Sequence, residues 1–141
     1  MNTNVLQNSR KSMNTKEFLS RYAAGQRNFS AVNLIAANLS HVDLSNINLS
    51  NADLRGAKLS STNLTRANLS HVNLSGAKLS GAKLSGADLS GANLSEATLI
   101  GANLTKANMT MTNLTKADLS DVNVSHTYLQ GATMPDGTQH E

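Results

Sequence analysis

Residues 74–95 read LSGAKLSGAKLSGADLSGANLS, and leucine returns at every fifth position through the whole stretch. Serine follows each leucine, and alanine stands two positions before each leucine from Leu79 onward. A period of five is neither the period of two that marks a strand nor the 3.6 of a helix. The stretch therefore predicts a repeat architecture with a unit of its own.

The repeat keeps its phase from Phe29 to Met134, which gives 22 five-residue units, each centred on one residue of that series. The centre is leucine in 18 units, and alanine stands two positions earlier in 13. Asn or Asp occupies the position just before the centre in 16 units, and Ser or Thr the position just after it in 17. Only the second position after the centre, here called the corner position, varies freely. The pattern thus specifies four of the five positions.

The spacing within a unit indicates how the chain runs. Side chains two residues apart on an extended segment share a face, so alanine and leucine point inward together and the residue between them points outward. The next two residues, such as Ser85 and Gly86, suit the middle of a four-residue turn, and Gly or Asn at the second place favours type II. Four corners close a coil of 20 residues, so residues 20 apart stack in columns, and 22 units make about five and a half coils. The residues expected along the axis include Phe29, Leu34, Leu54, Leu74, Leu84 and Leu104.

Tandem AxLxx units such as ANLSH (67–71) and ADLSG (87–91) resemble the pentapeptide-repeat family over residues 27–136. The resemblance implies an all-β solenoid, a right-handed quadrilateral β-helix with a short N-terminal α-helical cap. The flanking segments TKEFLSRYAAGQRNFS (15–30) and GATMPDG (131–137) are similar to those of cyanobacterial members. Such relatives include regulators of cell differentiation.

The length of 141 residues fits one domain with short flanks. Met13 could itself be an initiating residue, so residues 1–12 are expected to be either an overhang or a disordered tail. The last coil lacks a covering helix, so we expect self-association, as a homodimer, at that end. The expected segments are a tail at 1–13, a capping helix at 14–25, the β-helix at 27–136 and a C-terminal tail at 137–141.

The capping helix carries start and stop signals. Asn14 and Glu17 have the spacing of a capping box, and Gly25 stands where a helix commonly ends. The apolar side chains that would cover the first coil are Phe18, Leu19 and Tyr22.

The composition argues against several classes of protein. Cysteine is absent, no run of 18 apolar residues exists, and the first 25 residues lack the apolar core of a secretory signal. We therefore expect a cytoplasmic protein without disulfides or membrane contact. The four histidines fall in different columns, the serines recur without distinction, and no loop breaks the phase to form a pocket. No catalytic, metal or cofactor site is expected.

Eleven Asn residues begin N-x-Ser/Thr sequons. The repeat itself creates these sequons, because Asn before the centre and Ser after it satisfy the pattern. We therefore expect the side-chain amides to form a stacked ladder from coil to coil rather than to carry glycans.

The charge pattern separates the remaining functions. Some pentapeptide-repeat proteins bind DNA topoisomerases by imitating the acidic duplex, which requires a field of negative charge. Here residues 27–136 carry eight Lys/Arg against seven Asp/Glu, and no acidic residue lies between Asp53 and Asp88. Duplex mimicry is therefore disfavoured, and nucleic acid is not an expected partner. The cations of this interval form a predicted basic belt of Arg55, Lys58, Arg66, Lys78 and Lys83.

The belt has two interpretations: a surface that keeps the rod soluble, which is the simpler one, and a docking surface for an acidic protein. The sequence as a whole favours a non-enzymatic rigid scaffold or protein-protein interaction module whose partner it does not identify. The alternative is a DNA-mimic modulator of a DNA topoisomerase.

Overall fold

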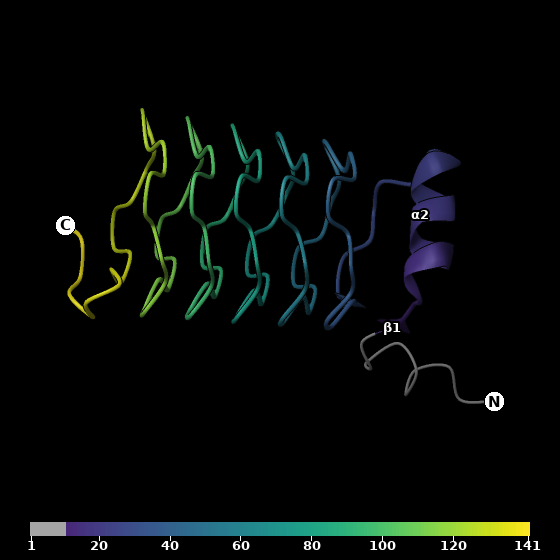
Figure 1. Ribbon diagram of the computed structural model, residues 1–141, viewed down its shortest axis with the longest axis horizontal. Helices are drawn as coiled ribbons and strands as arrows, with labels where there is room; N and C mark the ends of the chain where they lie inside the picture. Colours follow the sequence, from purple (N-terminus) through teal and green to yellow (C-terminus); the bar gives the residue numbers. More distant parts are fainter. Residues whose placement is uncertain (1–10) are drawn as a thin grey trace.

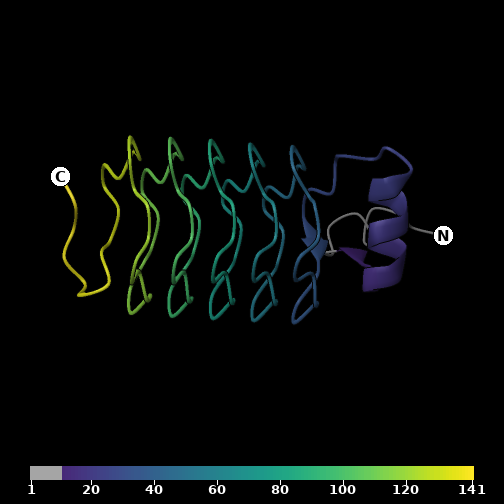
Figure 2. The same ribbon diagram turned by 45° about the horizontal axis from the view of Figure 1, so that its top comes forward.

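The computed structural model describes residues 11–141, and these form a β-helix solenoid with a single short helix (Figures 1 and 2). The elements are β1 (Lys11–Ser12), α2 (Thr15–Ala23) and β2 (Val32–Asn33). Helix α2 lies across one end of the stacked coils, and the C-terminus lies at the opposite end (Figure 1).

The coils are joined by parallel backbone bridges between residues 20 apart, from Asn28 with Asn48 to Asn113 with Thr133. The centres from Phe29 to Leu114 each donate their N–H to the following coil, as Leu84 does to the carbonyl of Asn103 at 2.8 Å. One coil therefore contains four five-residue units. Because every coil is bonded to the next, the backbone polar groups inside the stack are satisfied without long strands.

The core consists of the centre residues from Phe29 to Leu114, all of which are buried, whereas the centres of the last coil are more exposed. The six side chains named above for the axis are each at most 3% exposed. The alanines two positions earlier are buried beside them, because the narrow interior has room only for small side chains. Where Thr62 and Thr112 replace alanine, each hydroxyl donates a 2.8 Å hydrogen bond to a carbonyl, that of Leu39 or Leu89. The buried hydroxyls are thus satisfied.

The corner positions have a left-handed backbone. Among residues 11–141, fourteen residues other than glycine have φ between 56° and 66°, all at corner positions. In the unit of Leu84 the N–H of Ala87 donates to the Leu84 carbonyl at 3.0 Å, and φ of Gly86 is 66°. A closed four-residue turn with positive φ at its third residue fits the type II turn that the sequence predicts.

Helix α2 is capped at both ends by the residues that the sequence indicates. Asn14 is the N-cap, and its side-chain oxygen accepts the N–H of Glu17 at 2.8 Å. Gly25 has φ of 105° and donates its N–H to the carbonyl of Tyr22 at 2.9 Å. The regular helix, Thr15–Ala23, is therefore the expected segment 14–25 without its capping residues.

The helix closes the first coil with an aromatic contact. The ring of Phe18 is fully buried and meets the ring of Phe29 edge to face, with centroids 4.7 Å apart. On the same helix, the Tyr22 hydroxyl donates to the carbonyl of Ser45 at 2.7 Å. These contacts cover the buried centre residues at this end of the solenoid.

The N-terminal flank differs from the expected boundary of a tail at 1–13. Strand β1 pairs in parallel with β2, and the following residue, Met13, is buried in the core. Residues 11–13 thus extend the ladder over the first coil, because Met13 supplies apolar surface and β1 supplies backbone bonds. The rest of the expected tail, residues 1–10, lies outside the described residues.

The C-terminal segment, expected to be a tail at 137–141, pairs with the last coil. The chain reverses at the turn that contains Pro135, and Thr133 then pairs with Gln139 in antiparallel orientation. The N–H of His140 donates to the carbonyl of Ala132 at 2.7 Å. Residues 138–140 therefore cover one edge of the last coil, while Val124 and Tyr128 remain 45% and 65% exposed. Self-association at this end stays a prediction.

Candidate functional site

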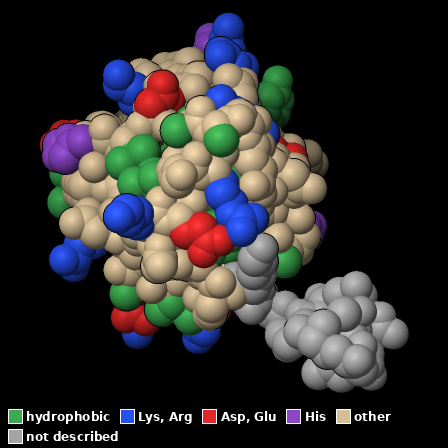
Figure 3. Space-filling model, turned by 90° about the vertical axis from the view of Figure 1, so that its right-hand side faces the viewer, with side chains coloured by type: hydrophobic (Ala, Val, Ile, Leu, Met, Phe, Trp, Pro, Cys, Tyr) green, Lys and Arg blue, Asp and Glu red, His purple; other side chains and the backbone are tan. Residues whose placement is uncertain are grey.

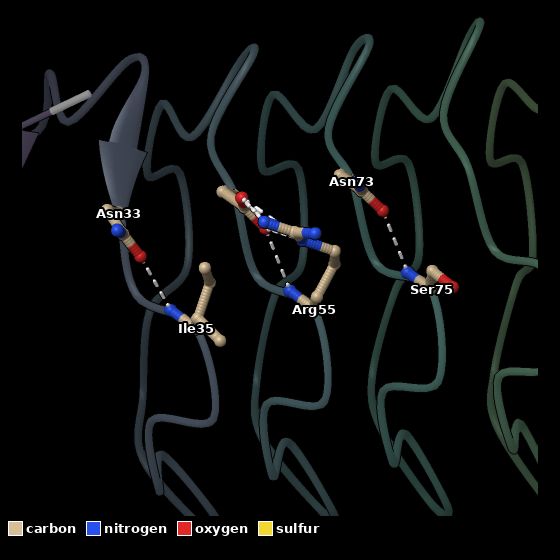
Figure 4. A network of polar contacts seen from close by, with 6 residues as sticks. Asn33, Ile35, Arg55, Asn73 and Ser75 are labelled. Carbon is tan, nitrogen blue, oxygen red and sulfur yellow. Dashed lines mark hydrogen bonds and ion pairs between the residues drawn. The ribbon is translucent and has the colours of Figure 1, made fainter. Parts of the chain in front are cut away.

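The outer surface of most units is organised by one local hydrogen bond. In all 16 units with Asn or Asp before the centre, the side-chain oxygen accepts the N–H of the residue after the centre, at 2.9–3.2 Å. Figure 4 shows this bond in three successive coils, at Asn33, at the unit of Arg55 and at Asn73. We call it the Asx bond.

The Asx bond replaces the expected ladder of amides. Among the described residues one amide bond of that ladder is present, from Nδ2 of Asn48 to Oδ1 of Asn28 at 3.3 Å. The physical reason is local: Asn and Asp reach their own backbone two residues onward, so their oxygen is taken within the unit. The expectation of a continuous ladder was wrong.

In several units the hydroxyl after the centre donates to the same oxygen. These bonds are 2.6–2.7 Å long at Thr65, Ser70, Ser90 and four other units. At Asp118 the hydroxyl and then the N–H of Ser120 lower the pKa of the carboxyl group. An N–H and an O–H that converge on one point therefore favour a negatively charged oxygen there.

Arg55 is not a free cation of the predicted belt. Its Nη2 lies 2.7 Å from Oδ2 of Asp53, and its Nε lies 2.9 Å from Oδ1. The hydrogen bond to Asp53 also raises the pKa of the guanidinium. Because Asp53 and Arg55 point outward from the same unit, their charges largely cancel.

Lys58, Lys78 and Lys83 are exposed and stand before the centre, where the Asx residue usually is. The structure places Lys58 directly beside Lys78 on the next coil. Lys83 follows one unit later, so it lies on the adjoining column. We call these three residues the lysine surface.

Arg66 contributes to a separate hollow at a corner. Its Nε donates to Oδ1 of Asn46 at 3.1 Å. Arg66, Ser85, Gly86 and Lys106 line a hollow of about 360 Å³ together with two threonines. The predicted belt omitted Lys106, although its spacing of 40 residues from Arg66 places both in one column.

The end of the molecule that carries the helix has a mixed distribution of charge. Seen from the helix end, basic side chains are spread around the rim and interspersed with acidic ones (Figure 3). Within residues 11–141 no group of three or more His, Cys, Asp or Glu could hold a metal ion. In the same residues no helix is both long and apolar enough to cross a membrane.

The family model for pentapeptide repeats matches eight copies, over residues 28–66, 47–86, 82–121 and 99–134. The chain is 30% identical to Rfr23, a pentapeptide repeat protein of the cyanobacterium Cyanothece, covering 86% of this chain and 97% of that one with a TM-score of 0.51. A pentapeptide repeat protein from Nostoc is 35% identical, covering 82% and 98%, with a TM-score of 0.49.

A pentapeptide repeat protein from the thylakoid lumen of Arabidopsis thaliana is 26% identical, covering 84% of this chain and 73% of that one, with a TM-score of 0.56. No curated protein sequence gives a match. The family model spans most of the chain, and its repeats coincide with the units that form the coils. The chain therefore belongs to the pentapeptide-repeat family.

Proposed function

We propose that this protein is a non-enzymatic rigid scaffold of the cytoplasm that presents its lysine surface to another protein. The four units of a coil would be the sides of a right-handed quadrilateral, with about five and a half coils in the repeat. The single observation that carries the proposal is the lysine surface itself. It is the one place where exposed cations replace the Asx residue, in adjoining units of a repeat that keeps Asn or Asp in 16 of its 22 units.

The arrangement of Lys58 and Lys78 supports docking over solubility alone. The backbones of these two residues are bridged and about 4.8 Å apart along the stack, so their like charges are held on neighbouring positions and repel. Each lysine also gives up an Asx bond, which typically contributes about 0.5–1.5 kcal/mol. A lysine that serves only solubility can stand at a corner position, as Lys116 does, where it neither displaces an Asx bond nor stacks on another lysine.

Changing all three residues of the lysine surface to Asn tests the proposal. The melting temperature should rise, because each Asn restores an Asx bond of roughly 1 kcal/mol and removes a repelling charge. Capture of a protein partner from the native host's lysate, measured by mass spectrometry, should fall and lose its sensitivity to salt. A double change of Lys16 and Lys116 to Asn is the control. Equal capture by the parent and the triple variant would overturn the proposal.

The alternative function, modulation of a DNA topoisomerase by duplex mimicry, gives the opposite expectation. With eight basic and seven acidic residues, the repeat has no net negative field to compete with DNA. In a supercoiling assay with DNA gyrase, we therefore expect no inhibition at micromolar protein. Inhibition that persists in the triple Asn variant would favour the alternative.

A further inference from the structure

At the lysine surface, backbone and hydroxyl donors have no acceptor among the described residues of the chain. A lysine ammonium only donates hydrogen bonds, so it cannot replace the oxygen of Asn or Asp. In these three units, unlike the 16 Asx units, no hydrogen bond among the described residues engages the N–H or the hydroxyl of the serine after the centre. We call these groups the open donor pairs; they belong to Ser60, Ser80 and Ser85.

The Asx units show what an open donor pair would bind. There one oxygen lies 2.9–3.2 Å from the N–H, and at Ser70 and Ser90 it also lies 2.7 Å from the hydroxyl. In the unit of Ser90 that oxygen belongs to a carboxylate, Asp88. An oxygen from outside the chain can occupy the equivalent place in the lysine units, with an ammonium group in the same unit.

The open donor pairs are close together. Ser60 and Ser80 occupy one column on adjacent coils, because the lysines two residues before them are bridged. Ser85 belongs to the next unit along the chain. The column continues to Ile100, whose unit also lacks an Asx residue and whose side chain is 39% exposed. The three open donor pairs and the exposed side chain of Ile100 therefore lie in neighbouring units of the surface.

Two further cations lie beside the third pair. Ser85 lines the hollow of about 360 Å³ with Arg66 on one side and Lys106 on the other. Gly86 has no side chain to fill the space between them, so the hollow is open to solvent. No acidic residue occurs between Asp53 and Asp88, and Asp53 is bound to its own arginine. An anion that reaches Ser85 thus meets the positive charge of Arg66 and Lys106, and the carboxylate in the column of Lys83, that of Asp43, lies two coils away.

We propose that the open donor pairs bind the carboxylates of an acidic segment of a partner protein, with Ile100 in contact with an apolar side chain of that segment. The inference rests on the proposed function, because it assigns the chemistry of the partner at the lysine surface. A single carboxylate fills one pair, whereas a segment with several Asp or Glu residues fills adjoining pairs at once. Nucleic acid fits less well, because Asp43 and Asp118 stand in the two lysine columns and would repel a long polyanion.

The test uses the full chain and a hexaglutamate peptide as the probe, with hexaglutamine as the uncharged control. In ¹⁵N NMR titrations the amides of the open donor pairs should shift most, while those of Ser70 and Ser90 should not move. Changing Ser60, Ser80 and Ser85 to Ala keeps every charge and removes the three hydroxyls. It should weaken binding about tenfold, which corresponds to about 1.4 kcal/mol.

The matched control changes Ser70, Ser90 and Ser120 to Ala, since their hydroxyls already donate to their own Asx oxygens. It should bind hexaglutamate within about twofold of the parent. Equal losses in the two serine variants, shifts centred on other amides, or no binding by the parent would each overturn the inference. Tighter binding of an oligothymidylate at the same amides would also overturn it.

These outcomes are distinguishable from failure of the proposed function. If partner capture depends on the lysines but not on Ser60, Ser80 and Ser85, the scaffold proposal stands and the open donor pairs are not its binding site. If partner capture depends on the lysines and also on Ser60, Ser80 and Ser85, both proposals hold. The triple change of the lysines to Asn should abolish hexaglutamate binding and the shifts at these amides, because each Asn then supplies the oxygen internally.

Discussion

Replacing Leu84 by Asp is expected to unfold the solenoid at neutral pH. Leu84 is 1% exposed, and its column neighbours Leu64 and Leu104 are equally buried. Loss of a buried leucine typically removes about 2–5 kcal/mol, and an unpaired buried carboxylate costs several kcal/mol more. The sum, roughly 5 kcal/mol or above, reaches the range of a whole domain's stability. Circular dichroism and thermal melting measure the loss.

The matched control for this change is Gly86→Asn, two residues onward. A Cβ at Gly86 would lie 3.5 Å from Cγ of Arg66, an ordinary contact, and Asn46 and Asn51 already occupy corners with φ near 60°. We expect a loss of less than about 1 kcal/mol. If Leu84→Asp melted like the parent, the assignment of centres to the axis would be wrong by at least one residue.

The pH dependence of the same variant provides a second check. Burial raises the folded-state pKa of a carboxyl group above its unfolded value, so the folded form of Leu84→Asp takes up a proton more readily. The free energy of unfolding that the variant loses relative to the parent should therefore be smallest in acid, and it should grow as the pH rises toward and through that raised pKa. Comparison with the parent at each pH is needed, because the parent's own Asp43 and Asp118 have lowered pKa values and lose stabilisation in acid.

Phe18→Ala is expected to detach the capping helix. The side chain is fully buried and contacts Phe29, so its removal should cost about 3–5 kcal/mol. A nine-residue helix is not stable alone in water, so α2 should lose its helical signal once it no longer packs. Faster hydrogen exchange of the Phe29 amide, which donates to Asn48, would report the opened end.

The control for the helix is Ser20→Ala, at an exposed position of α2 where alanine is the better helix former. Its melting should equal that of the parent or exceed it slightly. Because neighbouring coils are the main contacts in a solenoid, the damage from Phe18→Ala should remain near the first coil. Unchanged exchange at Phe29 would show that the helix is not what covers this end.

The sequence contains most of the information on the coil, because each position of the unit has one physical task. Leucine at the centre and alanine two positions earlier identify the inside, and the corner position before Ala87 is marked by glycine. From Phe29 to Leu114 the structure has the centres where the pattern places them, whereas in the last coil, which no further coil covers, centres such as Val124 are exposed. The caps at Asn14 and Gly25 are equally readable, since each is a local signal.

The hydrogen bonds of the outer surface were not predicted, although they join residues only two positions apart in the sequence. Asn and Asp favour hydrogen bonds to their own backbone two residues onward, so the Asx bonds could have been inferred from the N-L-S pattern. The pairing of Asp53 with Arg55 follows from the same two-residue spacing. Both flanks depend instead on backbone pairing by polar residues, Ser12 at one end and Gln139 at the other, which composition does not reveal.

Backbone bridges between residues 20 positions apart give every coil of this protein the same length and the same height along the stack. Duplication of a gene segment encoding 20 residues would lengthen it by about 4.8 Å and leave every column aligned. Duplication of a single five-residue unit would preserve the leucine axis but move all later residues one column around. Placed between Lys58 and Lys78, such an insertion would separate the two lysines without harming the fold. Insertion of a whole coil would therefore change the length and keep the surface columns, whereas insertion of fewer units would rearrange the lysine surface.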